Sequence, residues 1–372
     1  MRTAIFSVYQ KNLFVPDDVV FLLKSLRSVS DKIIVVVNGN INNSNVLEEN
    51  SDIVFYRENK GFDAGAYKFV LNKDAHLNFI QNSDELVFCN DTFYGPFISF
   101  KQIFEEMDSV ECDFWGLNLA DNGFVTFLQS FFLCFRKKIL NSRILDLFFS
   151  DEINENTLDF YEVLLKFERG IFEYLVKNDF KYGYYRRQIH HVMSNPAGSI
   201  LYDNLPLLKK KAFSERFYNN DSILDALCCI NKNYAYNVDY IIDDVKDRYG
   251  LVINKNDFCN RDISKVSSKT MDYSMVSKNQ IKDFVKNHKS VYLYGAGRLA
   301  RTISELIGIE NIQGFIVSSI GENKNSYLDK PVYCINDFFK ELTVPVIVAL
   351  NSANTAEVKS VLKDFKNVLF LW

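Results

Sequence analysis

The stretch SDIVFYRENKGFDAGAYK, residues 51–68, changes from one kind of backbone to another along its length. Its first part is rich in β-branched and aromatic residues, its middle part holds a turn at Gly61, and its last part has the apolar spacing of a helix. A strand, a loop and a helix in this order form the repeating unit of a parallel α/β sheet. The stretch therefore predicts an α/β fold, with the loop at the carboxyl end of a strand.

The flanking segments continue the alternation of strands and helices. Buried strands are predicted at 3–9 and 31–40, with a helix at 17–29 between them, and a further strand at 85–89 stops at the polar pair Asn90 and Asp91. Further elements are expected as strands at 111–120 and 129–140, a helix at 157–178 and a strand near 180–185. We therefore expect a mostly parallel sheet domain over 1–215, followed by a helical extension and linker over 216–286.

A second, small Rossmann-like α/β domain is predicted over residues 287–372. The segment YLYGAGRLAR, 292–301, places Gly295, Gly297 and Ala300 between a strand and a helix, which is the context of a dinucleotide-binding turn. The next strand, QGFIVSS, ends without the Asp or Glu that would hold a ribose hydroxyl group. We therefore expect no NAD here, and we interpret the domain as structural, regulatory or oligomerising, with a homo-oligomer as one outcome.

Composition limits the class of protein. The chain has 372 residues, enough for two or three domains, and a formal net charge of -4, which offers no polycationic field to attract nucleic acid. The seven cysteines lie mostly in apolar runs without a CxxC pair, which is typical of reduced, buried thiols. The N-terminus lacks the continuous apolar region of a signal peptide, and no apolar run approaches 18 residues. We expect a cytoplasmic protein with, at most, peripheral membrane contact.

Polar residues gather at the predicted carboxyl ends of the strands, where open α/β sheets bind ligands. Gly61 and Gly65 allow the backbone to turn and to approach a ligand, and the N-terminus of the following helix favours an anionic group. This pattern predicts a nucleotide diphosphate site. The residues predicted to bind this nucleotide are Tyr9, Asn38, Asn59, Lys60, Gly61, Asp63, Gly65, Asn90 and Asp91. The alternative interpretation is an ordinary strand-to-helix turn with Asp63 as a helix N-cap.

Five motifs carry a resemblance to a known family. They are NKGFDAGAYKFVL, LVFCNDTFYGPF, CDFWGLN, LQSFFLCFRKKIL and DNLPLLKKKAF. In this order, within residues 3–215, they resemble the motif series of the rhamnan synthesis protein F family, bacterial glycosyltransferases of surface polysaccharide assembly. More faintly, the chain is similar to inverting GT-A glycosyltransferases. The resemblance implies transfer of L-rhamnose from the nucleotide sugar donor dTDP-rhamnose to a lipid-linked glycan acceptor.

The resemblance also implies a place for a metal ion. Asn90, Asp91 and Thr92 occupy the position of the Asp-x-Asp metal motif of GT-A enzymes, but the first residue here is Asn. Mg²⁺ is typically held by one or two carboxylates together with substrate phosphates, so Asp91 is the expected ligand of a divalent cation, Mg²⁺ or Mn²⁺. The alternative role for Asp91 is to cap the turn that follows.

Sugar transfer needs a base for the acceptor hydroxyl group and positive charge for the leaving diphosphate. By resemblance to inverting GT-A enzymes, Glu168 is the expected base, and Asp113 is expected on the acceptor side; a solvated helix charge is the alternative for Glu168. Trp115 offers an apolar face for a sugar ring or belongs to the core. Arg186 and Arg187 suit a diphosphate, unless they form a solvated charge run.

Two other features have simpler interpretations. His190 and His191 lack further ligands at metal-site spacing, so no zinc site is predicted, and Lys209–Lys211 are short of the usual lysine cluster for anionic lipid. Two alternative functions remain open. One is an NAD(P)-dependent sugar oxidoreductase that works through the C-terminal domain. The other is a non-catalytic module of a polysaccharide assembly complex, which Asn90 favours.

Overall fold

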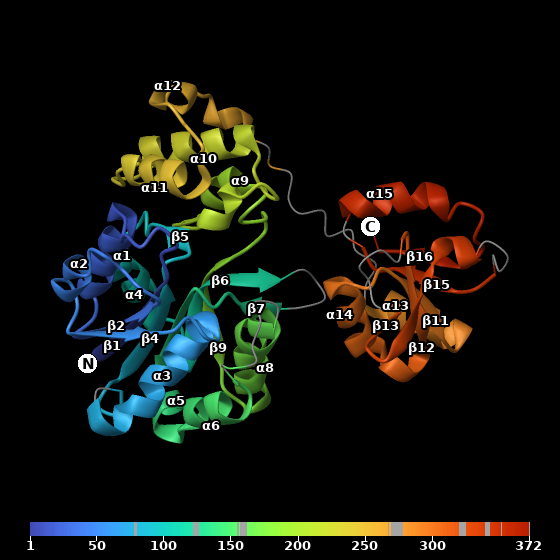
Figure 1. Cartoon of the computed structure of the whole chain (residues 1–372), viewed down its shortest axis with the longest axis horizontal. Helices are drawn as coiled ribbons and strands as arrows, with labels where there is room; N and C mark the ends of the chain where they lie inside the picture. Colours follow the sequence, from blue (N-terminus) through green and yellow to red (C-terminus); the bar gives the residue numbers. More distant parts are fainter. Residues whose placement is uncertain are drawn as a thin grey trace. The chain divides into compact units, whose positions relative to one another are not determined.

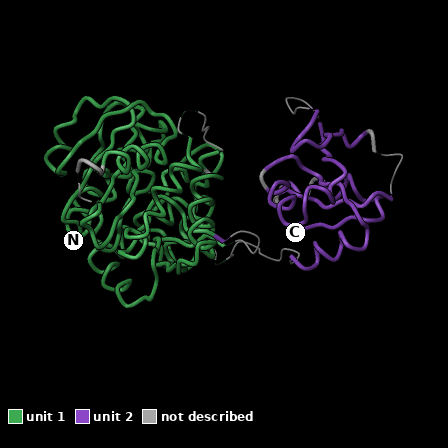
Figure 2. Tube along the Cα trace, turned by 90° about the horizontal axis from the view of Figure 1, so that it is seen from below, with its two compact units in different colours: residues 1–121, 127–271 green, residues 122–126, 272–372 purple. Residues whose placement is uncertain are grey.

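The computed structural model describes residues 1–77, 80–121, 126–154, 156, 162–266, 268, 278–319, 325–338, 343–350 and 352–371. Contacts divide the chain into two compact units, unit 1 with residues 1–121 and 127–271, and unit 2 with residues 122–126 and 272–372 (Figure 2). No helix within the described ranges combines the length and apolar composition needed to cross a membrane. Each unit has its own hydrophobic core and is described by itself.

Unit 1 is built on a mixed, mostly parallel sheet, as the sequence predicts. Its strands are β1 (Arg2–Val8), β2 (Lys32–Asn38), β3 (Ile53–Arg57), β4 (Glu85–Asn90), β6 (Phe114–Asp121), β7 (Thr126–Leu128), β8 (Phe132–Arg136) and β9 (Tyr182–Arg187). They lie in the order β3-β2-β1-β4-β8-β6-β7, with β9 paired to β6. Strand β8 runs antiparallel to both of its neighbours, β4 and β6. Strands β4 and β6 therefore run in the same direction.

Helices cover the sheet because their apolar residues recur at helical spacing. In α1 (Asp17–Arg27), the buried residues Val19, Leu22, Leu23 and Leu26 form one stripe that packs on the strands. The other helices are α2 (Asn45–Glu48), α3 (Phe62–Leu77), α4 (Phe100–Asp108), α5 (Lys137–Ser142), α6 (Ile144–Asp151), the π-helical segment η1 (Val163–Arg169) and α8 (Gly170–Lys177). The predicted helix at 157–178 is thus found over 163–177, and its first residues, 157–161, lie outside the described residues.

The order of strands creates a switch point between β1 and β4. The chain passes from β1 to β2 and β3 on one side, and returns to β4 on the other side of β1. Connections that leave two adjacent parallel strands in opposite directions open a crevice at their carboxyl ends, which is where α/β sheets bind ligands. The residues that follow these two strands are Tyr9 and Asp91.

A helical region completes unit 1. It contains α9 (Pro196–Leu201), η2 (Lys210–Phe213), α10 (Asn220–Asn233), α11 (Asp239–Tyr249), α12 (Lys255–Phe258) and η3 (Ile263–Lys265). Figure 1 shows the helices α9, α10 and α11 of this region next to β5 (Phe93–Tyr94). Strand β10 (Leu208–Lys209) joins this region to the sheet domain by pairing antiparallel with β5. Tyr94 and Phe97 share one hydrophobic core with α10 and α11. The predicted division at 215/216 is therefore not a domain boundary, because the helices after it pack into unit 1.

Unit 2 is a second α/β sheet domain, as predicted. Its strands are β11 (Val291–Tyr294), β12 (Ile312–Val317), β13 (Ser326–Tyr327), β14 (Lys330–Cys334), β15 (Val346–Val348) and β16 (Val368–Phe370), in the order β13-β14-β12-β11-β15-β16. Its helices are α13 (Lys278–His288), α14 (Arg298–Ile307), η4 (Ile309–Asn311), η5 (Ile335–Phe338) and α15 (Ser352–Val361). Because Ile281 and Val285 of α13 are buried in the core of unit 2, the division lies at 271/272 and not at the predicted 286/287.

Candidate functional site

The loop that follows β3 is folded around the side chain of Arg57. The guanidinium group of Arg57 donates from Nη2 to the carbonyl oxygen of Lys60 at 2.8 Å and from Nη1 to Oδ1 of Asn38 at 2.7 Å. Gly61 turns the chain with a φ of +68°. A Cβ atom on Gly65 would lie only 2.1 Å from the carbonyl oxygen of Lys60. The two glycines are therefore required for this tight loop, and Asn38 helps to hold it.

The loop places Asp63 in the first turn of α3, opposite the end of β4. Nδ2 of Asn90 donates to Oδ2 of Asp63 at 2.5 Å, and Oδ1 of Asn90 accepts from the hydroxyl group of Thr92 at 2.6 Å. Burial raises the pKa of Asp63, although hydrogen bonds from its own backbone and from Asn90 oppose the shift. An asparagine can make both hydrogen bonds of Asn90 at once, whereas an aspartate in its place would face the Asp63 carboxylate. This contact explains why the first residue of the motif is Asn.

Asp91 is fixed from the other side of the switch point. Its Oδ2 accepts hydrogen bonds from the backbone N–H of Tyr9 at 3.2 Å and from Nε2 of Gln10 at 2.5 Å. Gln10 in turn accepts from Nη2 of Arg248, on α11, at 2.9 Å. Burial raises the pKa of Asp91, and the charges of Lys210 and Arg248 oppose the shift. The helical region therefore helps to orient a carboxylate at the edge of the sheet.

Lys209 brings a positive charge to the same place. The pairing of β10 with β5 sets Lys209 opposite Phe93, and its Nζ donates to Oγ1 of Thr92 at 2.7 Å. Burial lowers the pKa of Lys209 to about 8, while the negative charges of Glu168 and Asp63 act to raise it. Glu168 also acts on Lys211. Glu168 therefore lies within electrostatic range of Lys209 and Lys211.

Glu168 lies in the π-helical segment η1 (Val163–Arg169). A π-helical turn is a rare departure from α-helical geometry that occurs often at functional sites. The segment leads directly into α8 and then β9, so the predicted order of helix and strand around Glu168 is confirmed. The role of Glu168 as a base stays a prediction.

Trp115 does not belong to the site. Its side chain is 0% exposed and lies between Phe104 and Phe132, with ring centroids at 5.0 and 5.5 Å. A ring enclosed in this way has no face for a sugar. The prediction of a stacking platform at Trp115 is therefore wrong, and the alternative of a core residue is correct.

Asp113 and Asp91 lie at opposite ends of the strands. It precedes β6, which runs parallel to β4, so it is at the amino end of the strand, whereas Asp91 follows the carboxyl end of β4. Its carboxylate accepts from Nζ of Lys138 and from the backbone N–H of Lys181, both at 2.8 Å. The prediction of an acceptor-side role for Asp113 is wrong, because the residue precedes the amino end of β6 and its carboxylate is held by Lys138 of α5 and by the backbone before β9.

The two arginines of YYRRQIHH end strand β9, at the same edge as Asp91. Arg186 pairs with Glu106 of α4 at 3.3 Å and stacks on the ring of Tyr185 at 3.8 Å, and Arg187 pairs with Asp121 at 2.8 Å. Their proposed contact with phosphate stays a prediction. In the same motif, His190 is buried and its Nδ1 lies 2.8 Å from Oδ1 of Asp203, which indicates a structural role.

Tyr9 and Asn59 offer further groups to a ligand. Tyr9 is 48% exposed, so its ring is open to solvent while its backbone holds Asp91. Oδ1 of Asn59 is buried and has no hydrogen-bond partner among the described atoms, and a buried acceptor of this kind needs a donor from a ligand or water. Lys60 is exposed and pairs with Glu58. Tyr9 and Asn59 therefore fit a donor-binding role.

The donor set for a metal ion is small. Among the residues that the structure describes, no group of three or more His, Cys, Asp or Glu side chains is arranged to hold a metal. Asp63 and Asp91 flank Asn90, and one or two carboxylates are what Mg²⁺ needs when phosphates supply the remaining ligands. The divalent cation at Asp91 stays a prediction.

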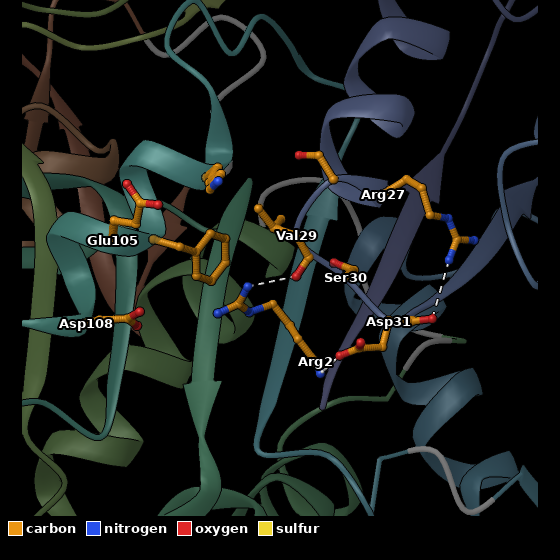
Figure 3. A pocket seen from close by; sticks show the side chains of 10 residues that line it. Arg2, Arg27, Val29, Ser30, Asp31, Glu105 and Asp108 are labelled. Atoms are coloured by element: carbon orange, nitrogen blue, oxygen red, sulfur yellow. Dashed lines mark hydrogen bonds between the residues drawn. The ribbon is translucent and has the colours of Figure 1, made fainter.

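A cavity of about 420 Å³ lies elsewhere, at the amino ends of β1 and β2 (Figure 3). It is lined by residues that include Arg2, Arg27, Asp31 and Phe104. The guanidinium group of Arg2 lies 3.7 Å from the centre of the Phe104 ring and donates to the carbonyl oxygen of Val29. Because ligands bind at the carboxyl ends in sheets of this type, we do not assign the candidate site to this cavity.

The glycine turn of unit 2 has a structural explanation at its first position. Gly295 has a φ of +112°, and a Cβ atom there would lie 2.9 Å from the carbonyl oxygen of Ala349. The backbone N–H of Gly295 donates to the carbonyl oxygen of Ile316 at 2.7 Å. This glycine therefore allows β11 to lie close to its neighbours in the sheet, which accounts for Gly295 without any ligand.

The fold and the site together define an α/β protein with a cluster of polar and charged residues at the switch point of a mostly parallel sheet. The chain belongs to the rhamnan synthesis protein F family, whose family model matches residues 33–290. The matched range contains the loop around Arg57, the Asn90-Asp91 pair, Glu168 and Lys209.

Individual relatives are similar over only part of the chain or at low sequence identity. The virulence protein VirA of Vibrio anguillarum is 32% identical over 126 residues, which are 33% of this chain and 38% of VirA. The glycosyltransferase GlyE of Streptococcus pneumoniae TIGR4 aligns over 99% of this chain and 90% of its own, at 12% identity and a TM-score of 0.33. A cytidylyltransferase of Leptospira borgpetersenii aligns over 70% and 98%, at 15% identity and a TM-score of 0.32. Likeness at these TM-scores is too low to bear on the chemistry of the site.

Proposed function

We propose that the protein is a GT-A-like glycosyltransferase that transfers a sugar from a nucleotide sugar to a cell-surface polysaccharide acceptor. The family to which the chain belongs is named for rhamnan synthesis, which supports L-rhamnose as the sugar and dTDP-rhamnose as the donor. The observation that carries the proposal is that Asp63, Asp91 and Lys209 lie together at the switch point, with Glu168 within electrostatic range of Lys209. A lipid-linked glycan acceptor would place the reaction in the cytoplasm, at the inner face of the membrane.

The donor is proposed to lie across the carboxyl ends of β1 and β4. The exposed ring of Tyr9 is available to the nucleobase, and Oδ1 of Asn59 can accept a hydrogen bond from it. The N-terminus of α3, which carries Asp63, faces the diphosphate with its backbone N–H groups. When bound at Asp91, Mg²⁺ or Mn²⁺ would supply further positive charge to the diphosphate. The measure of that contribution is turnover in EDTA compared with turnover in Mg²⁺.

The reaction is proposed to be a single displacement. The oxygen of the acceptor hydroxyl group forms a bond to the anomeric carbon of the sugar, and its proton passes to the carboxylate of Glu168. The bond from the anomeric carbon to the diphosphate breaks, and its electron pair leaves with the nucleoside diphosphate. Because attack and departure occur on opposite faces, the product has the inverted anomeric configuration.

The test is turnover of a panel of nucleotide sugars by the wild type and by Glu168→Gln. We expect the substitution to lower kcat by roughly 10²-fold or more, the size of a general-base contribution, with little change in donor affinity. Glu173→Gln is the matched control, because Glu173 is exposed on the following helix and pairs only with Arg169 among its described contacts. A wild-type protein that turns over no nucleotide sugar, or a Glu168→Gln variant with normal kcat, would contradict the proposal.

A further inference from the structure

Lys209 is held in a defined position by the strand to which it belongs. Strand β10 pairs with β5, and the backbone N–H of Lys210 donates to the carbonyl oxygen of Thr92 at 3.1 Å. Side chains of successive residues in a strand point to opposite sides. In β10, Leu208 is buried in the core shared with α10 and α11, and Lys209 points the other way, towards Thr92. Lys210 is the first residue of η2 and is buried, with its Nζ at 2.6 Å from Asp18 and 3.6 Å from Asp244.

The surroundings of the Lys209 ammonium group are those of a ligand-binding cation. Its Nζ uses one of three donors on Thr92 and lies 4.2 Å from the centre of the Phe131 ring. From Lys209 a directed chain of hydrogen bonds runs through Thr92 and Asn90 to Asp63. This chain fixes the ammonium group beside the N-terminus of α3, where an anionic group is also favoured.

We infer that Lys209 binds the diphosphate of the donor and stabilises the negative charge that develops on it as the bond to the sugar breaks. The inference rests on the proposed function and adds to it a residue that holds the leaving group. A lysine is a compact point charge that suits phosphate oxygens, and preorganised charge at a leaving diphosphate is an effective form of catalysis. The negative charge of Glu168 acts on Lys211 as well as on Lys209, and Lys211 adds a second positive charge near Lys209.

This role differs from a contact with anionic lipid, which is the other source of phosphate for a lysine cluster. Lys209 is partly buried between β5, Phe131 and the polar motif, and Lys210 is fully enclosed by carboxylates. Only Lys211 of the three is exposed. A surface that binds headgroups needs several lysines directed to solvent, which these three do not provide.

The test is calorimetric titration of the full-length protein with dTDP, UDP, GDP, inorganic pyrophosphate and the free nucleosides, all in EDTA. EDTA isolates the contribution of the lysine from that of any ion at Asp91. We expect Lys209→Gln to weaken binding of the preferred nucleoside diphosphate, and of pyrophosphate, by roughly 10- to 100-fold. The affinity for the free nucleoside should stay unchanged, and Lys209→Arg should retain most of the diphosphate affinity. Lys265→Gln is the control, since Lys265 is an exposed lysine that pairs with Asp262.

The possible failures are distinguishable. If the wild type binds a nucleoside diphosphate and Lys209→Gln binds it equally well, the role of Lys209 is refuted and the proposed function stands. If Lys209→Gln loses nucleoside and diphosphate affinity to the same degree, the lysine supports the fold and not the diphosphate. If the wild type binds none of the nucleoside diphosphates, either in EDTA or in a parallel titration with Mg²⁺, both the inference and the proposed function are refuted.

Discussion

The contact between Asn90 and Asp63 gives a sharp test of the site, because Asn90→Asp changes charge with almost no change in shape. In the wild type, Nδ2 of Asn90 donates to Oδ2 of Asp63 at 2.5 Å. The variant replaces this donor with a second carboxylate at the same distance. Asn90 is 4% exposed, so water cannot separate the two groups. Two carboxylates this close cannot both ionise without a large cost.

The size of the effect follows from the interaction that is lost. A hydrogen bond to a charged group contributes about 1.5–3 kcal/mol, and a buried charge left without its partner costs about 3–5 kcal/mol. Since one proton can be shared between the carboxyl groups, we expect a loss below the upper end of these values, about 2–4 kcal/mol. For a unit of this size, about 2–4 °C of Tm corresponds to 1 kcal/mol, so Tm should fall by about 4–16 °C.

The pH dependence has a definite sign. Burial already raises the pKa of Asp63, and a neighbouring carboxylate raises it further. A carboxyl group whose pKa is higher in the folded than in the unfolded protein stabilises the fold below its unfolded pKa, and this stabilisation is lost as pH rises through the folded pKa. The deficit of Asn90→Asp relative to the wild type should therefore be larger at pH 8 than at pH 5.

The assay is thermal unfolding of the wild type, Asn90→Asp and the control Asn42→Asp at pH 5 and pH 8. Asn42 is exposed, so its variant has the same net charge without a carboxylate opposite. If Asn90→Asp unfolds at the same temperature as the control at pH 8, or if its deficit grows on acidification, the hydrogen bond from Asn90 to Asp63 is not the fixed contact described here.

Three further predictions test the loop, the lysine and the domain boundary. Gly65→Ala should lower the free energy of unfolding by about 1–3 kcal/mol in thermal denaturation, because its Cβ would strike the Lys60 carbonyl oxygen, whereas Gly297→Ala, with open space at the Cβ, should be neutral; equal effects would contradict this reason. Burial lowers the pKa of Lys209 to about 8, and the charges of Asp63, Asp91, Glu168 and Lys211 also act on this lysine. Calorimetry across pH should therefore show that the affinity for diphosphate falls above about pH 8, as the ammonium group loses its proton. Unchanged affinity up to pH 10 would refute this prediction. A chain of residues 1–271 should fold and bind nucleotide sugar, and an insoluble product would show that the units share a core.

Local sequence pattern was sufficient for most of the fold and for part of the site. Strands β2 and β4 of unit 1 contain continuous apolar runs, and the polar residues Asn38 and Asp91 that end or follow these strands lie at their carboxyl ends. The spacing of Gly61 and Gly65 correctly indicated a tight loop. These features depend on residues close together in the chain, so they can be predicted from the sequence.

Features that depend on distant contacts were not predicted. Lys209 enters the site because β10 pairs with β5, which joins residues 117 positions apart in the hydrogen bond to Thr92. Arg248 reaches Asp91 through Gln10, across 238 positions. The prediction for Asp113 was wrong because the local motif does not show at which end of β6 the residue lies. The direction of β6 in the sheet places it before the amino end. The KKK run within DNLPLLKKKAF was the available signal for Lys209.

The spread of the site along the chain has a consequence during protein synthesis. A nascent chain that has emerged only as far as β9 has the sheet and Glu168 but lacks Lys209 and Arg248. The complete set of site residues exists only once α11 has left the ribosome and docked. A ligand that binds the finished site stabilises unit 1 as a whole by mass action, in proportion to the logarithm of its concentration. The supply of that ligand in the cell would then influence how much newly made protein escapes proteolysis.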